Sequence, residues 1–189
     1  MNKKEILENI EKENIKIEPF YEELLKEDSY DVRLGNFYYR FKKPEYFSSN
    51  IINPYSTNLE SNWDGPCISK NLTKIFKFEN ISENDEFILL GPEETILAHT
   101  SEHIGVNGFR IKVKRLKEFN FLTLNVRSEQ EFSKITLEIK NNSKLSVLLI
   151  VNRPIATISF HRNNIKRNIE NKKLWSCQDM IDLSTGIFR

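Results

Sequence analysis

Three residues near the middle of the chain have the spacing of a zinc-peptidase site. His99, Glu102 and His103 form the pattern H-x-x-E-H, in which two histidines bind the metal and the glutamate activates a bound water. That chemistry needs both histidines on one face of a helix. The run at 95–98 is strand-like and Gly105 follows soon after. The sequence therefore favours a strand without zinc, in which Glu102 is structural or exposed.

No other cofactor signature is complete. Pro66-Cys67 matches the start of the P-C-x-x-C half of a zinc-dependent nucleoside deaminase, but the second cysteine is missing. The chain has 6 glycines, and they form neither a P-loop nor a dinucleotide-binding G-x-G-x-x-G. We expect no tightly bound cofactor, and Mg²⁺ only as a companion of nucleotide phosphates.

A basic stretch follows the histidines. Arg110, Lys112 and Lys114 alternate with apolar residues and would share one face of a strand, and Arg115 and Lys117 extend the run. One interpretation is a solvated face. The other is a phosphate-binding rim for a nucleoside triphosphate or a polynucleotide. The chain's net charge of +1 gives no global field that would attract nucleic acid, so we do not expect a nucleic-acid partner.

Two carboxylates lie within alternating strand patterns. Glu138 sits among Ile135, Leu137 and Ile139, and by itself this pattern indicates a polar-face glutamate that pairs with a lysine across the sheet. Asp31, between Tyr30 and Val32, is by the same reasoning an exposed-face aspartate.

The surrounding pattern predicts an all-β protein. Residues 2–13 form an amphipathic helix. Many short alternating runs at roughly 8–12-residue spacing indicate a sandwich or barrel over about 15–162. A polar tail covers 163–189, and we expect the whole of 1–189 to be a single domain. The predicted strands begin at Tyr30 and include 87–90, 95–98, 109–113, 121–126, 135–139, 147–151 and 155–160.

The composition is that of a folded domain in a reducing compartment. There are 13 Phe and 6 Tyr, which opposes disorder. The two cysteines, Cys67 and Cys177, are far apart and do not suggest a disulfide framework. No apolar run reaches the ~20 residues of a membrane span, and the N-terminus lacks a signal-peptide pattern. A cytoplasmic location and no membrane partner are expected.

The order of four segments resembles the dCTP deaminase branch of the dUTPase superfamily. The opening is the most specific, and the resemblance covers most of 1–162, weakening between 44 and 85. The segments are the helix at 2–13 with Ile17-Glu18-Pro19-Phe20 and Ser29-Tyr30-Asp31-Val32-Arg33-Leu34-Gly35-Asn36, then 97–104, then Ile135-Thr136-Leu137-Glu138-Ile139-Lys140-Asn141, which is similar to the family's T-L-E-x-x-N, and finally 153–160.

The resemblance implies a dUTPase-like jelly-roll β-barrel, distorted here, that assembles as a homotrimer with sites between subunits. It also implies hydrolytic deamination of dCTP to dUTP without a catalytic metal. Glu138 falls on the family's catalytic glutamate, which would take a proton from the attacking water and deliver it to the leaving ammonia.

The segment that should hold phosphates departs from the family. Its G-R-S-S-x-x-R-x-G stretch is replaced by residues 114–122. Arg115 aligns with the first arginine, but the serines become Leu116 and Lys117, and Glu118 adds negative charge. If nucleotide binds, the phosphate ligands are Arg115 with Arg110, Lys112, Lys114 or Lys117. Two functions therefore stay open: a divergent dCTP deaminase-like enzyme acting on pyrimidine deoxynucleotides, or a catalytically inactive trimeric module with a binding or structural role.

Overall fold

The chain begins with one helix, α1 (Lys3–Glu11), in the computed structural model, which describes residues 1–42, 62–71, 78–128 and 132–162. Asn2 caps this helix: its side chain accepts from the Glu5 backbone N–H, and the Glu5 carboxylate accepts from the Asn2 backbone N–H. This reciprocal capping box satisfies two donors at the helix start. The helix is two residues shorter than the predicted 2–13 at its C-terminal end. The predicted tail, 163–189, lies outside the described residues.

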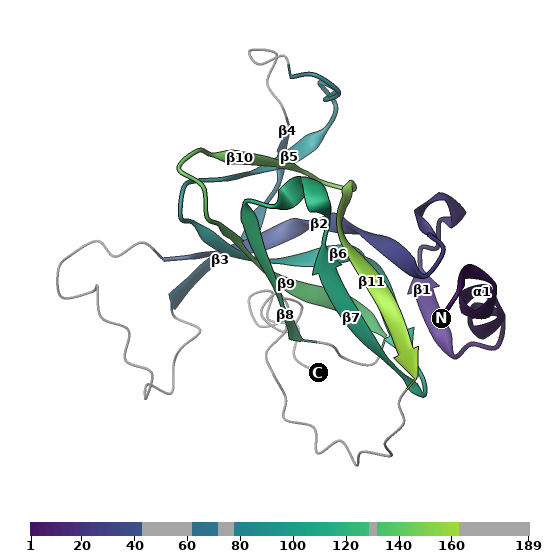
Figure 1. Ribbon diagram of the computed structural model, residues 1–189. Coiled ribbons are helices and arrows are strands. Elements are labelled where there is room, and N and C mark those ends of the chain that lie inside the picture. The colour runs from purple at the N-terminus through teal and green to yellow at the C-terminus, as the bar shows by residue number, and fades with distance from the viewer. Residues whose placement is uncertain (43–61, 72–77, 129–131, 163–189) are drawn as a thin grey trace.

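Almost all other regular structure is β, as the sequence predicts (Figure 1). Two short 3₁₀ turns, η1 (Glu22–Leu24) and η4 (Lys117–Phe119), interrupt the strands. The strands are β1 (Ile15–Glu18), β2 (Ser29–Phe41), β3 (Trp63–Ile68), β4 (Lys70–Asn71), β5 (Glu86–Leu90), β6 (Thr95–Val106), β7 (Phe109–Arg115), β8 (Leu122–Ser128), β9 (Ser133–Asn141), β10 (Val147–Ile150) and β11 (Pro154–Arg162).

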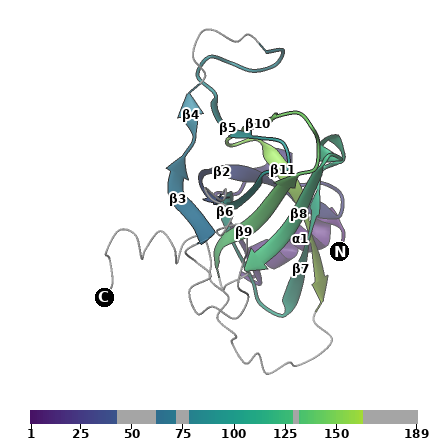
Figure 2. The same cartoon turned by 90° about the vertical axis from the view of Figure 1, so that its left-hand side faces the viewer.

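The main sheet curls into a nearly closed barrel. Its strands run in the order β7-β11-β2-β6-β9-β8, with β1 on β6 and β3 on β2. The two end strands, β7 and β8, contact each other and bring the barrel round on itself. A small sheet, β10-β5-β4, lies at one end, and β3 and β4 follow one another along one side (Figure 2). The predicted dUTPase-like jelly-roll type is confirmed.

The core fills the barrel with inward-facing apolar side chains from the long strands and from α1. Fully buried examples are Ile6 of α1, Tyr30 and Leu34 of β2, Ile96 of β6 and Leu137 of β9. At about 25 cal/mol per Å² of apolar surface removed from water, this burial is the main favourable contribution to folding. α1 belongs to the same core, because Ile6 packs against it.

Strand β2 is buried on both faces in its first half, which corrects the prediction of an exposed Asp31. Asp31 is 7% exposed. Its carboxylate accepts from the Thr157 hydroxyl at 2.7 Å and lies 3.4 Å from Lys26 Nζ. The chain before β2 turns sharply, with a bond from the Lys26 N–H to the Ser29 carbonyl, and this turn leaves the Lys26 side chain beside Asp31. The alternation of residues within β2 cannot reveal this burial, because the groups that cover Asp31 belong to other segments of the chain.

A buried ion pair fills the gap where β2 leaves β6. β6 pairs with β2 as far as Thr100 and with β1 from His103, so Glu102 faces the break between those two partners. The Glu102 carboxylate is fully buried; it accepts from the Arg33 backbone N–H at 2.9 Å and from Arg33 Nε at 2.6 Å. The guanidinium also stacks on Tyr21, 4.2 Å from the ring centre. Glu102 is therefore structural, and the exposed alternative is wrong.

Replacing Glu102 with Gln should destabilise the protein by about 3 kcal/mol, because the Arg33 charge is left in a site that is mostly closed to water. Urea unfolding at neutral pH measures this. Glu8→Gln is the matched control, since Glu8 is exposed on α1, and it should change stability by less than about 0.5 kcal/mol. Equal stabilities for the two variants would contradict the structural role of Glu102.

Candidate functional site

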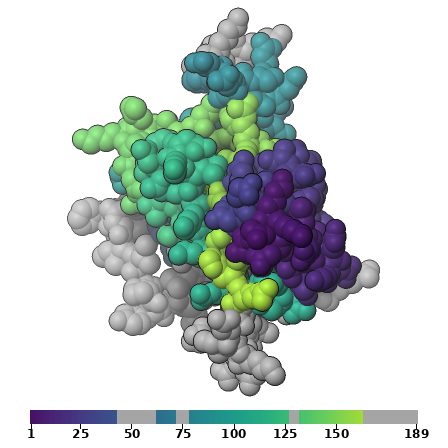
Figure 3. All heavy atoms as spheres, turned by 45° about the vertical axis from the view of Figure 1, so that its right-hand side comes forward, coloured from purple at the N-terminus to yellow at the C-terminus, as the bar shows by residue number. Residues whose placement is uncertain are grey.

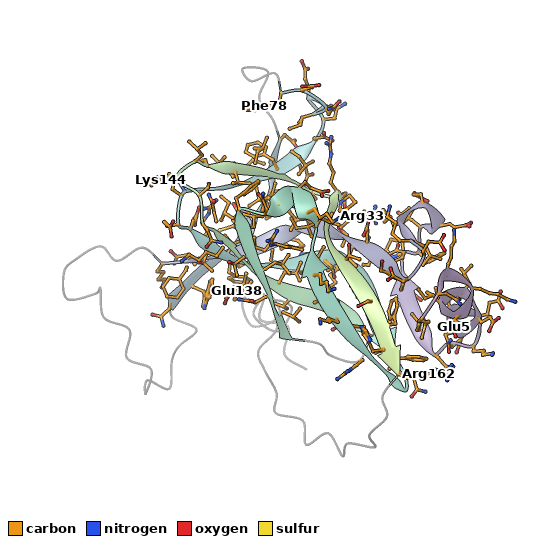
Figure 4. The ribbon with its side chains drawn as sticks, viewed as in Figure 1. Glu5, Arg33, Phe78, Glu138, Lys144 and Arg162 are labelled. Atoms are coloured by element: carbon orange, nitrogen blue, oxygen red, sulfur yellow. The ribbon has the colours of Figure 1, made fainter. Side chains whose placement is uncertain are left out.

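Four register partners form a row across the outer face of the barrel. Tyr39 of β2 lies opposite Leu97 of β6, Leu97 opposite Glu138 of β9, and Glu138 opposite Asn125 of β8. Because side chains at opposed positions of neighbouring strands point to the same face, the Glu138 carboxylate stands between an apolar and a polar neighbour. Figure 4 shows it on the barrel wall, well apart from Arg33 and Arg162.

Glu138 is partly buried and held in place. Asn125 Nδ2 donates to Glu138 Oε1 at 3.2 Å. On the other side Leu97 and Tyr39 are 7% and 4% exposed and pack with Trp63. A Cβ at position 65 would lie 2.6 Å from the Tyr39 ring, so the Gly65 backbone packs directly on that ring. The result is an oriented carboxylate at the border of an aromatic and aliphatic patch, able to accept or donate a proton.

His99 occupies the next row and supports β2 from the same face. Its Nε2 accepts from the Phe37 backbone N–H at 3.3 Å, and its Nδ1 lies 2.7 Å from the Thr100 carbonyl. Gly35 makes room for the ring, since a Cβ at that position would lie 2.1 Å from His99 Cε1. The ring thus fills a bulge at which β2 has extra residues relative to β6. This explains why a glycine occupies position 35 in the opening motif: any side chain there would clash with the imidazole.

The geometry of His99 is that of a neutral imidazole. With Nδ1–H donating to Thr100, Nε2 has a lone pair for Phe37, and both nitrogens are satisfied without a charge. Burial lowers the pKa of His99 to about 4, with the nearby Lys134 and His103 acting in the same direction. His99 and His103 lie on strand β6, not on a helix. Among the described residues no group of three or more His, Cys, Asp or Glu side chains is arranged to hold a metal ion.

Asn141, which ends the T-L-E-x-x-N-like segment, ties three parts of the chain together. Its Nδ2 donates to the carbonyls of Leu90, Gly91 and Leu145, and its Oδ1 accepts from the Ser143 N–H and hydroxyl. The side chain is fully buried. The chain bends at 143–145 directly after it, and this asparagine fixes the end of the strand that presents Glu138.

The basic stretch lies on a different part of the wall. Arg110, Lys112 and Lys114 project from one exposed face of β7, as predicted, and Arg115 and Lys117 are exposed at its end. β8 lies between β7 and the Glu138 strand β9. One copy of the chain therefore does not place these cations on a strand next to Glu138.

The altered phosphate segment is partly absorbed into the fold. It forms η4, where Phe119 packs against the core and meets Phe121 edge-on at 6.3 Å between ring centres. Leu116 is half-buried, while Glu118 is exposed. Phe121 is 36% exposed. The two aromatic residues of this segment thus pack together, and Phe119 joins them to the core.

The fold and the outward Glu138 row define a jelly-roll protein of the dUTPase-like class. A family model described as dCTP deaminase-like matches residues 1–163, so the chain belongs to the dCTP deaminase-like family. No curated protein sequence matches it. In the described part of the chain no helix has the length and apolarity to cross a membrane.

A solved structure of 2'-deoxycytidine 5'-triphosphate deaminase from Agrobacterium tumefaciens has a similar fold. The TM-score is 0.58 at 13% sequence identity, and the similarity covers 86% of this chain and 48% of that one. The chain thus spans about half the length of that enzyme. At this identity the likeness concerns the fold alone.

The neutral state of His99 predicts a specific pH dependence of stability. Between pH 6.5 and about 4 the unfolded chain binds a proton at residue 99 that the folded chain excludes, so stability falls as the pH is lowered through that window. At pH 4.5 the loss relative to pH 7 should be on the order of 2–3 kcal/mol.

Urea unfolding of the wild type and of His99→Gln at both pH values measures this contribution. The variant should lose less stability on acidification than the wild type by about that amount, because Gln does not titrate. An identical loss in both proteins would show that another group is responsible.

Proposed function

We propose that the protein binds a pyrimidine deoxynucleotide at the Glu138 row and deaminates dCTP to dUTP. The observation that supports this most directly is the oriented, partly buried Glu138 between Asn125 and the Leu97–Tyr39 patch. A pyrimidine ring has an apolar face and a polar edge, and this row offers a partner for each. Membership of the dCTP deaminase-like family supports the choice of substrate.

The chemistry asks Glu138 to move one proton. The carboxylate takes a proton from water as the water oxygen attacks C4 of cytosine. The same proton is then delivered to the departing amino group, and the second water proton, left on the C4 hydroxyl, passes to N3 as the C4 carbonyl forms and the C4–N bond breaks, so that dCTP and water become dUTP and ammonia. Asn125 donates to the carboxylate and so helps to hold it in place on the outer face.

The triphosphate needs cations that one copy of the chain does not put beside Glu138. The candidates are Arg115 and its neighbours Arg110, Lys112, Lys114 and Lys117, with Mg²⁺ entering as part of the substrate's phosphates. A homotrimer would complete the site by setting the basic segment of one copy against the β9 strand of the next. Charge-assisted contacts of this kind are strong and salt-dependent.

The second candidate is a non-catalytic oligomeric module. The observation that favours it is η4, where Phe119 packs against the core and the exposed Glu118 adds negative charge to the segment that would have to hold the phosphates. A fold does not by itself guarantee the activity of its relatives. The two candidates differ in one measurable property, which is the binding of dCTP.

Glu138→Gln should lower dCTP turnover by about 10²–10⁴-fold, because the amide keeps the shape but cannot accept the proton. Product chromatography after incubation with dCTP and Mg²⁺ gives the rate. Glu8→Gln, far from the row on α1, should keep the wild-type rate. Retention of most activity by the Glu138 variant would refute this mechanism.

Calorimetry with dCTP, dUTP and dTTP at low salt separates the two functions. An enzyme should release heat and gain thermal stability with dCTP, because a ligand well above its dissociation constant stabilises the folded state. Binding should weaken as salt rises, and Arg115→Ala should weaken it further. No heat and no stabilisation at millimolar nucleotide would leave the non-catalytic module as the function.

A further inference from the structure

The exposed face formed by β7 and β11 carries a line of cations, here called the basic stripe. Arg110, Lys112 and Lys114 occupy alternate positions of β7, and Arg162, which lies opposite Phe109 at the end of β11, lines the same hollow as Arg110. Arg115 and Lys117 follow at the other end of β7, where Arg115 lies opposite the buried Ala156 and so projects from the other face than Lys114. All six side chains are exposed. Figure 3 shows β11 as yellow-green atoms that run between teal atoms and the purple N-terminal segment.

These cations differ from most others in the described chain because they lack anionic partners there. Elsewhere Lys26, Arg33, Arg40, Lys140 and Arg153 each form an ion pair with a carboxylate. No ion pair joins a member of the basic stripe to any described carboxylate. Like charges at this density repel one another, and a bound polyanion would relieve that repulsion.

The carboxylates near the stripe are already engaged or lie at its ends. Asp31 is bound by Lys26 and Thr157. Glu5, which lines the same hollow as Arg110 and Arg162, accepts from the Asn2 backbone in the helix cap. Glu118 is exposed beside Lys117. The centre of the stripe is therefore uniformly positive although the chain's net charge is only +1.

The length of the stripe exceeds a single triphosphate. Alternate residues of a strand are about 6.6 Å apart, so Arg110 and Lys114 are separated by about 13 Å along β7. Three directly linked phosphates reach two neighbouring cations of such a row, not all of them. One nucleotide and two amino-acid residues add the same number of bonds to their backbones, so successive phosphates of an extended strand recur at a spacing similar to that of the cations.

The polar groups of β11 that lie opposite the cations can hydrogen-bond to phosphate oxygens. Ser159 of β11 lies opposite Lys112, and His161 lies opposite Arg110. The apolar residues of β7, including Phe109, face the core and pack against it. The face therefore offers no exposed aromatic ring from β7 on which a base could stack. A ligand would be held by its backbone, without regard to sequence.

We infer that the basic stripe binds the phosphate backbone of single-stranded nucleic acid, independently of sequence. This goes beyond the proposed deamination and does not rest on it. A single row of cations on a gently twisted sheet follows one strand, whereas a duplex presents two strands across a groove. The prediction from net charge that nucleic acid is not a partner did not take the segregation of charge into account.

Fluorescence anisotropy with a labelled 20-nucleotide oligodeoxythymidylate tests the inference on the full chain. With about four phosphates neutralised, affinity should fall about fifty-fold between 50 and 200 mM salt, a log–log slope of about −2.8. The double variant Arg110→Gln/Lys112→Gln should bind at least about tenfold more weakly, with a slope smaller in magnitude by about 1.4.

The matched control is Lys12→Gln/Lys144→Gln, which removes the same charge from exposed positions off the stripe. Figure 4 shows Lys144 and Arg162 at opposite ends of the barrel. This control should bind like the wild type. Equal weakening by both double variants would overturn the assignment to the stripe, and wild-type thermal stability of each variant excludes misfolding as the cause.

Three other results would also overturn the inference. They are no binding at 50 mM salt, tighter binding to a duplex of the same length, and equal affinity for polyglutamate of the same charge. Because the same cations are candidates for the dCTP phosphates, the oligonucleotide is titrated without nucleotide and dCTP without oligonucleotide, so that each binding is read separately. Oligonucleotide binding without dCTP heat would refute only the deaminase, and the reverse would refute only this inference.

Discussion

The change of partners along β2 is the constraint on which the rest of the barrel depends. The first half of this strand pairs with β11 and the second half with β6 and β3. A strand that changes neighbours leaves backbone groups without a ladder partner, and a buried unpaired N–H costs about 1–3 kcal/mol. Two side chains of β6 supply the missing acceptors: Glu102 for the Arg33 N–H and His99 for the Phe37 N–H. Gly35 between them permits the close approach of the imidazole.

This arrangement also determines what surrounds Glu138. The bulge at Gly35 shifts β2 relative to β6, and the shifted register is the one that brings Tyr39 opposite Leu97. Leu97 in turn lies opposite Glu138. The apolar surroundings of the Glu138 carboxylate on this side therefore depend on the bulge at Gly35, which lies in β2 on the other side of β6. A steric requirement at one glycine is transmitted through cross-strand pairing to the chemistry of the candidate site.

Sequence reasoning is accurate where a single strand's alternation decides the outcome. The exposed cations of β7 and the buried apolar residues of β9 are predicted from period two alone. The burial of Asp31 and Glu102 is not predictable in this way, because it depends on segments far away in the sequence. The same holds for β6, predicted as 95–98 and found as Thr95–Val106. Its polar residues 99–103 look like a strand's end, yet they fill the openings left by β2 and β1.

The candidate site follows the same division. The resemblance to the family places Glu138, and the structure adds Asn125, Leu97 and Tyr39, which share no motif and meet only through register. The structural role of Asn141 could have been suspected from its position before a Ser-containing turn, because a buried asparagine can serve several carbonyls at once. The five cations proposed from the sequence lie on and just after β7, apart from β9, which carries Glu138. Only the order of the strands reveals this separation.

The seam between β7 and β8 gives the barrel an uneven resistance to opening. These are the end strands of the hydrogen-bonded path and meet through packing, whereas β6 and β9 share a long ladder. Amide hydrogens along β6 and β9 should therefore exchange with deuterated solvent only in rare, nearly global openings. Those on the outer edges of β7 and β8 should exchange through cheaper local fluctuations. The strands β6 and β9, which carry Glu138, should thus exchange slowly as one unit. Strand β7, which carries the cations, can open locally without disturbing them.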